Sequence, residues 1–78
     1  MAIEPDIIDA RGLKCPLPVL KLEKRLATAQ PGTILTVLAT DPMARIDIPL
    51  HCRQNGHDYA LEEADGVFRF TITRSSEA

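Results

Sequence analysis

The residues best suited to chemistry lie in one short segment, residues 12–18, which reads GLKCPLP. Apolar residues at helical spacing follow this segment and predict a helix over residues 16–30, so that Cys15 lies at or beside its N-cap. Prolines are tolerated in the first turn of a helix, because the N–H groups there have no partner within the helix. Pro16 and Pro18 therefore predict a rigid helix start that directs the Cys15 side chain outward.

A cysteine held in this way is a candidate nucleophile. The thiolate is the reactive form, and a cysteine with an ordinary pKa is mostly protonated near neutral pH. The positive end of a helix dipole is too weak to change this alone, so Arg11 and Lys14 are expected to add positive charge beside Cys15. Gly12 belongs to the loop that carries these residues. The alternative is that Cys15 is a small, half-buried residue at a helix start.

The second cysteine, Cys52, lies within a later predicted helix and is interpreted as a buried apolar residue. A resolving thiol for Cys15 is the alternative. A metal site built from the cysteines with His51 and His57 has poor ligand spacing, and no CxxC pair is present. The sequence predicts no metal and no cofactor, and it supplies no paired general base for Cys15.

Glycine and proline positions divide the 78 residues into six short elements. The predicted strands cover 7–10, 33–40, 58–63 and 67–73, and the predicted helices cover 16–30 and 47–55. Asp41 is predicted to open a turn and Asp47 to cap the second helix. Asp65-Gly66 predicts a hairpin between the last two strands. The order β-α-β-α-β-β predicts a single domain over 1–78, an α/β (α+β) two-layer sandwich with a mixed four-stranded sheet and both helices on one face.

Composition and charge exclude several classes of function. Nine Lys and Arg residues against eleven Asp and Glu residues leave a formal charge of −2, whereas nucleic-acid-binding modules usually have a basic excess. No apolar run approaches the ~18 residues of a membrane span, and residues 1–9 lack the features of a signal peptide. Two cysteines are too few for a disulfide-stapled secreted protein. We therefore expect a cytoplasmic protein without membrane insertion or direct nucleic-acid binding, and with a frayed tail over 74–78.

The stretch DARGLKCPLPVLKLEKRL, residues 9–26, resembles the CPxP signature of the TusA/SirA-like sulfur-carrier family. The resemblance continues through 30–32, 41–42, 47–49 and Cys52, and it covers nearly the whole chain. It implies a β-α-β-α-β-β sandwich and a persulfide sulfur carried on Cys15. It also implies a cysteine desulfurase or rhodanese-type protein as sulfur donor, and a downstream sulfur-relay protein as acceptor.

Leu17 departs from one branch of this family. Members that serve tRNA thiolation typically have an acid there, whereas apolar residues resemble branches tied to sulfur oxidation, selenium metabolism or transport of sulfur compounds. The sequence thus favours a sulfur carrier with sulfurtransferase-type chemistry over a complete enzyme, without naming its pathway. One alternative is a non-catalytic regulatory or protein-interaction module. Another is an RNA-binding domain, since the predicted sandwich resembles a domain of a translation initiation factor, but the negative charge opposes it.

Overall fold

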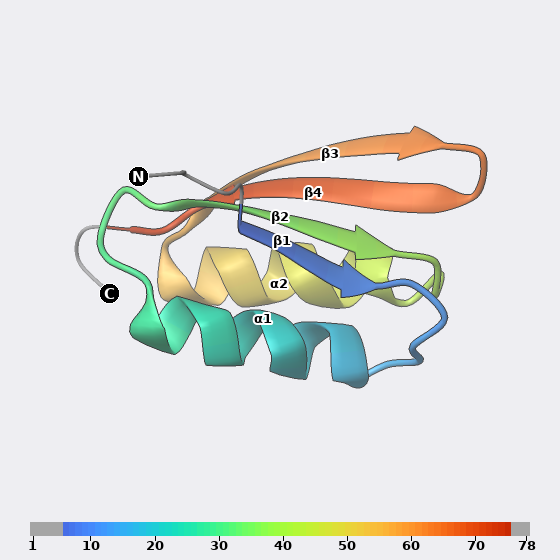
Figure 1. Ribbon diagram of the computed structural model, residues 1–78, viewed down its shortest axis with the longest axis horizontal. Coiled ribbons are helices and arrows are strands. Elements are labelled where there is room, and N and C mark those ends of the chain that lie inside the picture. The colour runs from blue at the N-terminus through green and yellow to red at the C-terminus, as the bar shows by residue number, and fades with distance from the viewer. Residues whose placement is uncertain (1–5, 76–78) are drawn as a thin grey trace.

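The computed structural model describes residues 6–75, in which a four-stranded sheet is covered on one face by two helices (Figure 1). The elements are β1 (Asp6–Ala10), α1 (Leu17–Thr28), β2 (Ile34–Ala39), α2 (Ala44–Asn55), β3 (Asp58–Ala64) and β4 (Val67–Thr73). The predicted order and the predicted two-layer architecture are confirmed.

The strands lie in the order β1-β2-β4-β3. β1 pairs with β2 in parallel, and the other two neighbouring pairs are antiparallel. The parallel pair is joined by α1, as a crossover between parallel strands requires. The β3–β4 hairpin turns at Asp65 and Gly66, whose φ angles of 53° and 78° suit the tight turn that this pair of residues predicts.

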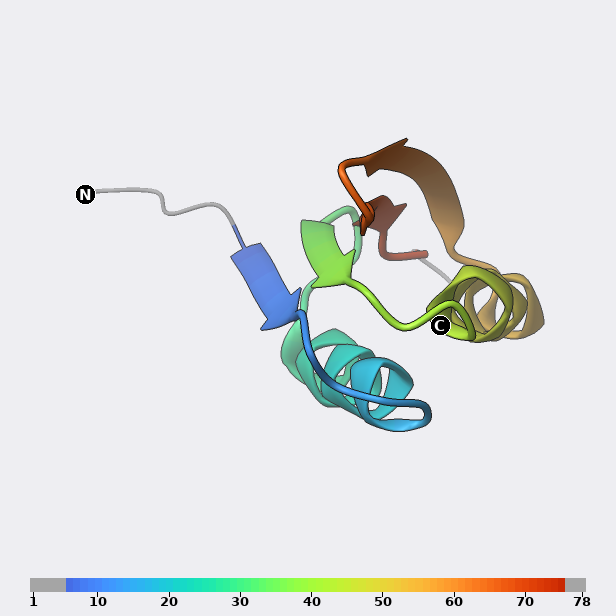
Figure 2. The same cartoon turned by 90° about the vertical axis from the view of Figure 1, so that its right-hand side faces the viewer.

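The core lies between the helices and one face of the sheet. In Figure 2, α1 packs beneath β1 and β2, while α2 packs beneath β3 and β4. The buried apolar side chains come from all of these elements except the edge strand β3, and they include Leu22, Leu26, Leu35, Val37, Ile48, Cys52, Phe68, Phe70 and Ile72. The opposite face of the sheet carries polar side chains such as Thr36, Arg69 and Thr71, as the alternation of the sequence predicts.

The second helix begins earlier than the sequence predicts. Asp41 opens the turn as expected, with its Oδ1 accepting a hydrogen bond from the Met43 N–H at 3.2 Å. The Ala44 N–H then donates to the Asp41 carbonyl at 2.9 Å, so the turn continues directly into α2. The N-cap is Met43, and Asp47 lies in the first turn of the helix. The prediction that Asp47 caps this helix is therefore wrong, and its carboxylate is available for another contact.

The chain after β4 is held in place where it is described. The Arg74 N–H donates to the Thr33 carbonyl at 2.9 Å, and the Ser75 N–H donates to His57 Nδ1 at 2.8 Å. The expected fraying is wrong for these two residues. Residues 76–78 of the tail, and residues 1–5 of the segment searched for a signal peptide, lie outside the described residues. Between residues 6 and 75, no helix combines the length and the apolar character needed to cross a membrane.

Candidate functional site

Cys15 lies in the loop between β1 and α1, one residue before the N-cap of the helix. Pro16 is the N-cap, and the buried Pro18 occupies the first turn. The Leu17 N–H donates to the Lys14 carbonyl at 2.8 Å, so this amide is engaged within the turn. The Cys15 side chain is exposed. The two prolines therefore shape a helix start with the cysteine at the surface, as the sequence predicts.

Two hydrogen bonds tie the Cys15 loop to the end of β2. The Gly12 N–H donates to Thr40 Oγ1 at 2.9 Å, and the Cys15 N–H donates to Asp41 Oδ2 at 2.5 Å. Gly12 has a φ of +80°, a conformation that glycine adopts without steric cost. Because both partners lie just after β2, the loop is fixed relative to the sheet and to the start of α2.

The thiol of Cys15 meets a carboxylate. Cys15 Sγ donates a hydrogen bond to Asp47 Oδ2, in the first turn of α2. This hydrogen bond raises the pKa of Cys15, and lost hydration and the negative charges of Asp47 and Asp41 raise it further. Each of these effects favours the protonated thiol.

The basic residues expected to ionise Cys15 do not do so. Arg11 instead forms a two-pronged ion pair with Asp9, with Nε–Oδ1 and Nη2–Oδ2 distances of 2.8 Å. The Arg11 hydrogen bonds lower the pKa of Asp9 to about 2, and Asp9 in turn raises the pKa of Arg11. Within residues 6–75, no basic group, and therefore not Lys14, is among the groups that shift the pKa of Cys15. The prediction of an electropositive setting is thus wrong, because the charged groups that act on the thiol are the carboxylates of Asp47 and Asp41.

Cys52 is buried in the core, with 0 % of its surface exposed. Burial raises the pKa of this thiol to about 11. A resolving thiol must reach the sulfur of Cys15 at the surface of the molecule, and the Cys52 side chain is not exposed there. The structure confirms the interpretation of Cys52 as a small apolar core residue.

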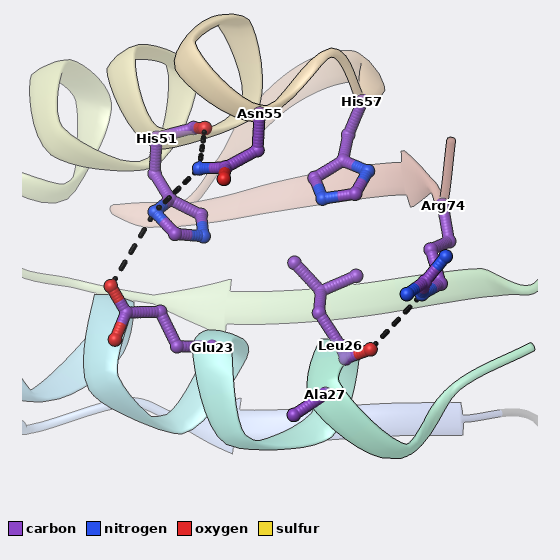
Figure 3. Close-up of a pocket in the computed structure, with 7 residues that line it drawn as sticks. All are labelled: Glu23, Leu26, Ala27, His51, Asn55, His57 and Arg74. Atoms are coloured by element: carbon purple, nitrogen blue, oxygen red, sulfur yellow. Dashed lines mark hydrogen bonds and ion pairs between the residues drawn. The ribbon is translucent and has the colours of Figure 1, made fainter. Parts of the chain in front are cut away.

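The histidines lie at a different place, around a cavity of about 190 Å³ between α1, α2 and the chain after β4 (Figure 3). His51 Nδ1 lies 3.5 Å from Glu23 Oε1, an ion pair when the imidazole is protonated, and this contact joins the two helices. His57 is buried, and its Nδ1 accepts the hydrogen bond from Ser75. No group of three or more metal-ligating side chains occurs in the described part of the chain. These contacts are interpreted as structural.

Exposed apolar side chains lie on the first turns of both helices, near the helix starts that bring Cys15 and Asp47 together. Leu17 on α1 and Ile46 on α2 are 47 % and 59 % exposed, and Met43 and Leu50 are exposed as well. A groove of about 230 Å³ runs between the helices, lined by residues that include Pro16, Asp47 and Leu50. Exposed apolar surface beside a reactive group is typical of a protein-docking surface. We call Leu17, Met43, Ile46 and Leu50 the apolar rim.

Sequence reasoning missed Asp47 as a site residue. A signal for it was present in the predicted topology, because the loops after two parallel strands emerge at the same edge of the sheet. Those loops lead into α1 and α2, so that polar residues at the two helix starts are brought together. The position of Asp47 near a helix start suits a cap equally well, which is the role that the sequence predicts for it.

Comparisons with known proteins agree with this fold and identify the family. The family model described as sulfurtransferase TusA matches residues 6–74. A protein of Neisseria meningitidis described as a candidate sulfur carrier is 48 % identical over 68 residues, covering 86 % of this chain and 92 % of its own. The sulfur carrier protein TusA of Pseudomonas putida is 40 % identical over 75 residues, covering 94 % of each chain. The crystal structure of a SirA-like protein from Desulfitobacterium hafniense superposes with a TM-score of 0.80 at 32 % identity, covering 88 % of this chain and 96 % of the other.

Proposed function

The chain belongs to the TusA/SirA-like family of sulfur carriers, and on that premise we propose that it carries a persulfide sulfur on Cys15. The observation that supports this assignment is the contrast between the two cysteines. Cys15 is exposed at a rigid helix start, whereas Cys52 is enclosed in the core. A sulfur that passes from one protein to another must be reachable by both, and only the Cys15 thiol meets that requirement.

The surroundings of Cys15 fit a carrier better than a complete enzyme. The thiol has one hydrogen-bonded carboxylate, and the apolar rim is open rather than folded into a substrate cavity. A small-molecule enzyme usually encloses its substrate in a pocket with several converging polar groups. We therefore assign the catalysis of transfer largely to the partner proteins, with this chain presenting the sulfur.

The proposed partners are a cysteine desulfurase or rhodanese-type donor and a downstream sulfur-relay acceptor. Both would dock on the apolar rim, because its exposed side chains lie on the two helices whose starts meet at Cys15 and Asp47. Arg11 and Lys14 lie in the loop before Cys15, and we assign them to this docking surface rather than to ionisation of the thiol. Gly12, Pro16 and Pro18 fix the loop and the helix start. Two free thiols fit a reducing compartment such as the cytoplasm.

Intact mass spectrometry tests the carrier role. The protein is incubated with a cysteine desulfurase and cysteine, and the mass is compared for wild type, Cys15→Ser and Cys52→Ala. We expect wild type and Cys52→Ala to gain one sulfur atom, and Cys15→Ser to gain none while keeping its far-ultraviolet circular dichroism spectrum. Loading of Cys15→Ser equal to wild type would refute the assignment.

A further inference from the structure

Asp47 is the one carboxylate that touches the sulfur atom of Cys15 in the described residues, and it does so through the thiol hydrogen itself. Asp41, the second carboxylate nearby, accepts its hydrogen bond from the Cys15 backbone N–H instead. We propose that Asp47 is the catalytic base that takes the proton from the Cys15 thiol when sulfur is loaded. This inference rests on the proposed function, because it concerns the same thiol.

The need for a base follows from the state of the free thiol. A thiol attacks sulfur as its thiolate, yet the surroundings of Cys15 favour the protonated form. A base within hydrogen-bonding distance removes this conflict, since it accepts the proton only as the sulfur forms its new bond. The acceptor is already aligned, because Asp47 Oδ2 is the hydrogen-bond partner of Sγ. Before transfer, the hydrogen bond to Asp47 favours the protonated thiol. During transfer, the same carboxylate is in place to accept the thiol proton.

The transfer balances without any further reactant. The donor carries a persulfide, in which a terminal S–H sulfur is bonded to its own cysteine sulfur. Cys15 Sγ attacks this terminal sulfur while its proton passes to the Asp47 carboxylate. A new S–S bond forms on Cys15, the S–S bond of the donor breaks, and its electron pair leaves with the donor sulfur as a thiolate. The proton on Asp47 then passes to that thiolate, so that one thiol and one persulfide are consumed and one of each is formed.

The position of the two carboxylates also bears on the loaded state. A persulfide ionises more readily than a thiol, and a negative terminal sulfur would be repelled by Asp47 and Asp41. Because Cys15 is exposed, that repulsion favours a terminal sulfur directed toward solvent, where an acceptor can reach it. Both carboxylates would thus promote release of the sulfur, whereas Asp47 alone would promote its loading.

The test compares two reactions of Cys15 that respond oppositely to loss of Asp47. Iodoacetamide alkylation reports the fraction of thiolate, while single-turnover loading from a purified persulfidated cysteine desulfurase reports transfer. Both are measured on Cys52→Ala protein and on the same protein carrying Asp47→Asn, Asp41→Asn or Asp58→Asn. Asp58 is an exposed carboxylate at the start of β3, so its variant controls for the change in net charge.

Asp47→Asn should alkylate faster near neutral pH, because the hydrogen bond and charge that favour the thiol are lost. Its loading should nevertheless be slower, on the order of a hundredfold, because the base is gone. Its loading rate should rise more steeply with pH than that of wild type, since ionisation by solvent would replace the base. Asp41→Asn should lower loading much less, and Asp58→Asn should change neither reaction.

Parallel acceleration of alkylation and loading in Asp47→Asn would overturn the proposal, and so would an unchanged loading rate. In either case Asp47 would only tune the charge state of the thiol. Asp47→Ser, which removes the carboxylate without introducing an amide, is measured in the same two assays. Like Asp47→Asn, it should alkylate faster and load sulfur more slowly than the protein with Asp47 intact. Failure of the protein with Asp47 intact to acquire sulfur on Cys15 is a separate outcome that refutes the carrier function itself.

Discussion

The Cys15 thiol and the Asp47 carboxylate are hydrogen-bonded although 32 positions of sequence separate them. They meet because β1 and β2 are parallel, so the loops that follow these strands leave the sheet at the same edge. Each loop leads into a helix, and the two helix starts lie side by side there (Figure 1). The group that would carry sulfur thus comes from the first β-α unit, and the charge that controls it comes from the second.

The charge of Lys14 should have little influence on the thiol. We expect Lys14→Glu to shift the Cys15 pKa less than Asp47→Asn does, because Asp47 touches Sγ and no basic group contributes in the described residues. Asp47→Asn should lower that pKa. Iodoacetamide rates against pH, measured in Cys52→Ala protein, give both values. A larger shift from Lys14→Glu would show that its ammonium reaches the sulfur.

The apolar rim should control transfer between proteins without controlling the thiol. Leu17→Ser and Ile46→Ser should each slow loading from a desulfurase on the order of tenfold, the change that corresponds to about 1.4 kcal/mol, if these side chains lie among the few contacts that contribute most to an interface. Alkylation of Cys15 by iodoacetamide should stay unchanged.

Ile34→Ser is the matched control for the rim, because Ile34 is 58 % exposed but lies at the start of β2, whereas the Cys15 loop is bonded near the end of that strand. Loading that slows equally in Ile34→Ser would show that the rim has no special part in docking.

Most of the fold could be predicted from the sequence because its signals are local. The Asp65-Gly66 hairpin and the strand over residues 34–39 each follow from turn chemistry or side-chain alternation. The faces of β3 were not predictable in this way. Alternation predicts that Phe68, Phe70 and Ile72 share one face and that Tyr59 and Leu61 share another. The structure instead pairs Tyr59 with Ile72 and Leu61 with Phe70, so these side chains lie on the same side of the sheet.

The candidate site was only partly predictable. Cys15 and its prolines are adjacent in sequence, so their relationship is local. The partner of the thiol depends on where α2 begins. The turn that Asp41 opens leads into a helix that begins at Ala44, three residues before Asp47. The expectation of positive charge failed for a similar reason. Arg11 forms its ion pair with Asp9, two residues earlier. The sequence shows that both charges are nearby, but it does not show which partner Arg11 contacts.

The Cys52 thiol should not react with alkylating reagents in the folded protein. With its thiol enclosed in the core, alkylation should require unfolding, whereas Cys15 should react in the native state. Cys52→Ala should lower the unfolding free energy by about 1 kcal/mol through lost packing. Cys52→Ser should cost about 1–3 kcal/mol, because a hydroxyl replaces the thiol in apolar surroundings.

Peptide mapping after iodoacetamide treatment with and without urea, and urea unfolding curves, measure these effects of Cys52. Native-state alkylation of Cys52 at the rate of Cys15 would contradict its placement in the core.

His57 should make the fold less stable in mildly acidic solution. Burial is the main cause that lowers its pKa, and the charges of Arg74 and His51 lower it further. The folded protein therefore binds a proton at His57 less readily than the unfolded chain does. It follows that the unfolding free energy is greatest above pH 6.5, the ordinary value for histidine, and falls as the pH drops from there toward the lowered pKa.

The hydrogen bond from Ser75 gives this prediction a structural signature. His57 Nδ1 accepts a hydrogen bond from the Ser75 N–H. A doubly protonated imidazole has no acceptor nitrogen, so protonation of His57 should break this hydrogen bond and lower the unfolding free energy by about 1 kcal/mol. His57→Asn retains an acceptor oxygen that does not titrate. Urea unfolding between pH 5 and pH 8, about the range over which histidine titrates, should therefore show a decline for wild type that is smaller in the variant. The His57 ring resonances should titrate below pH 6.5. Equal declines in both proteins would show that other groups cause the loss of stability, and that His57 is not coupled to the end of the chain through Ser75.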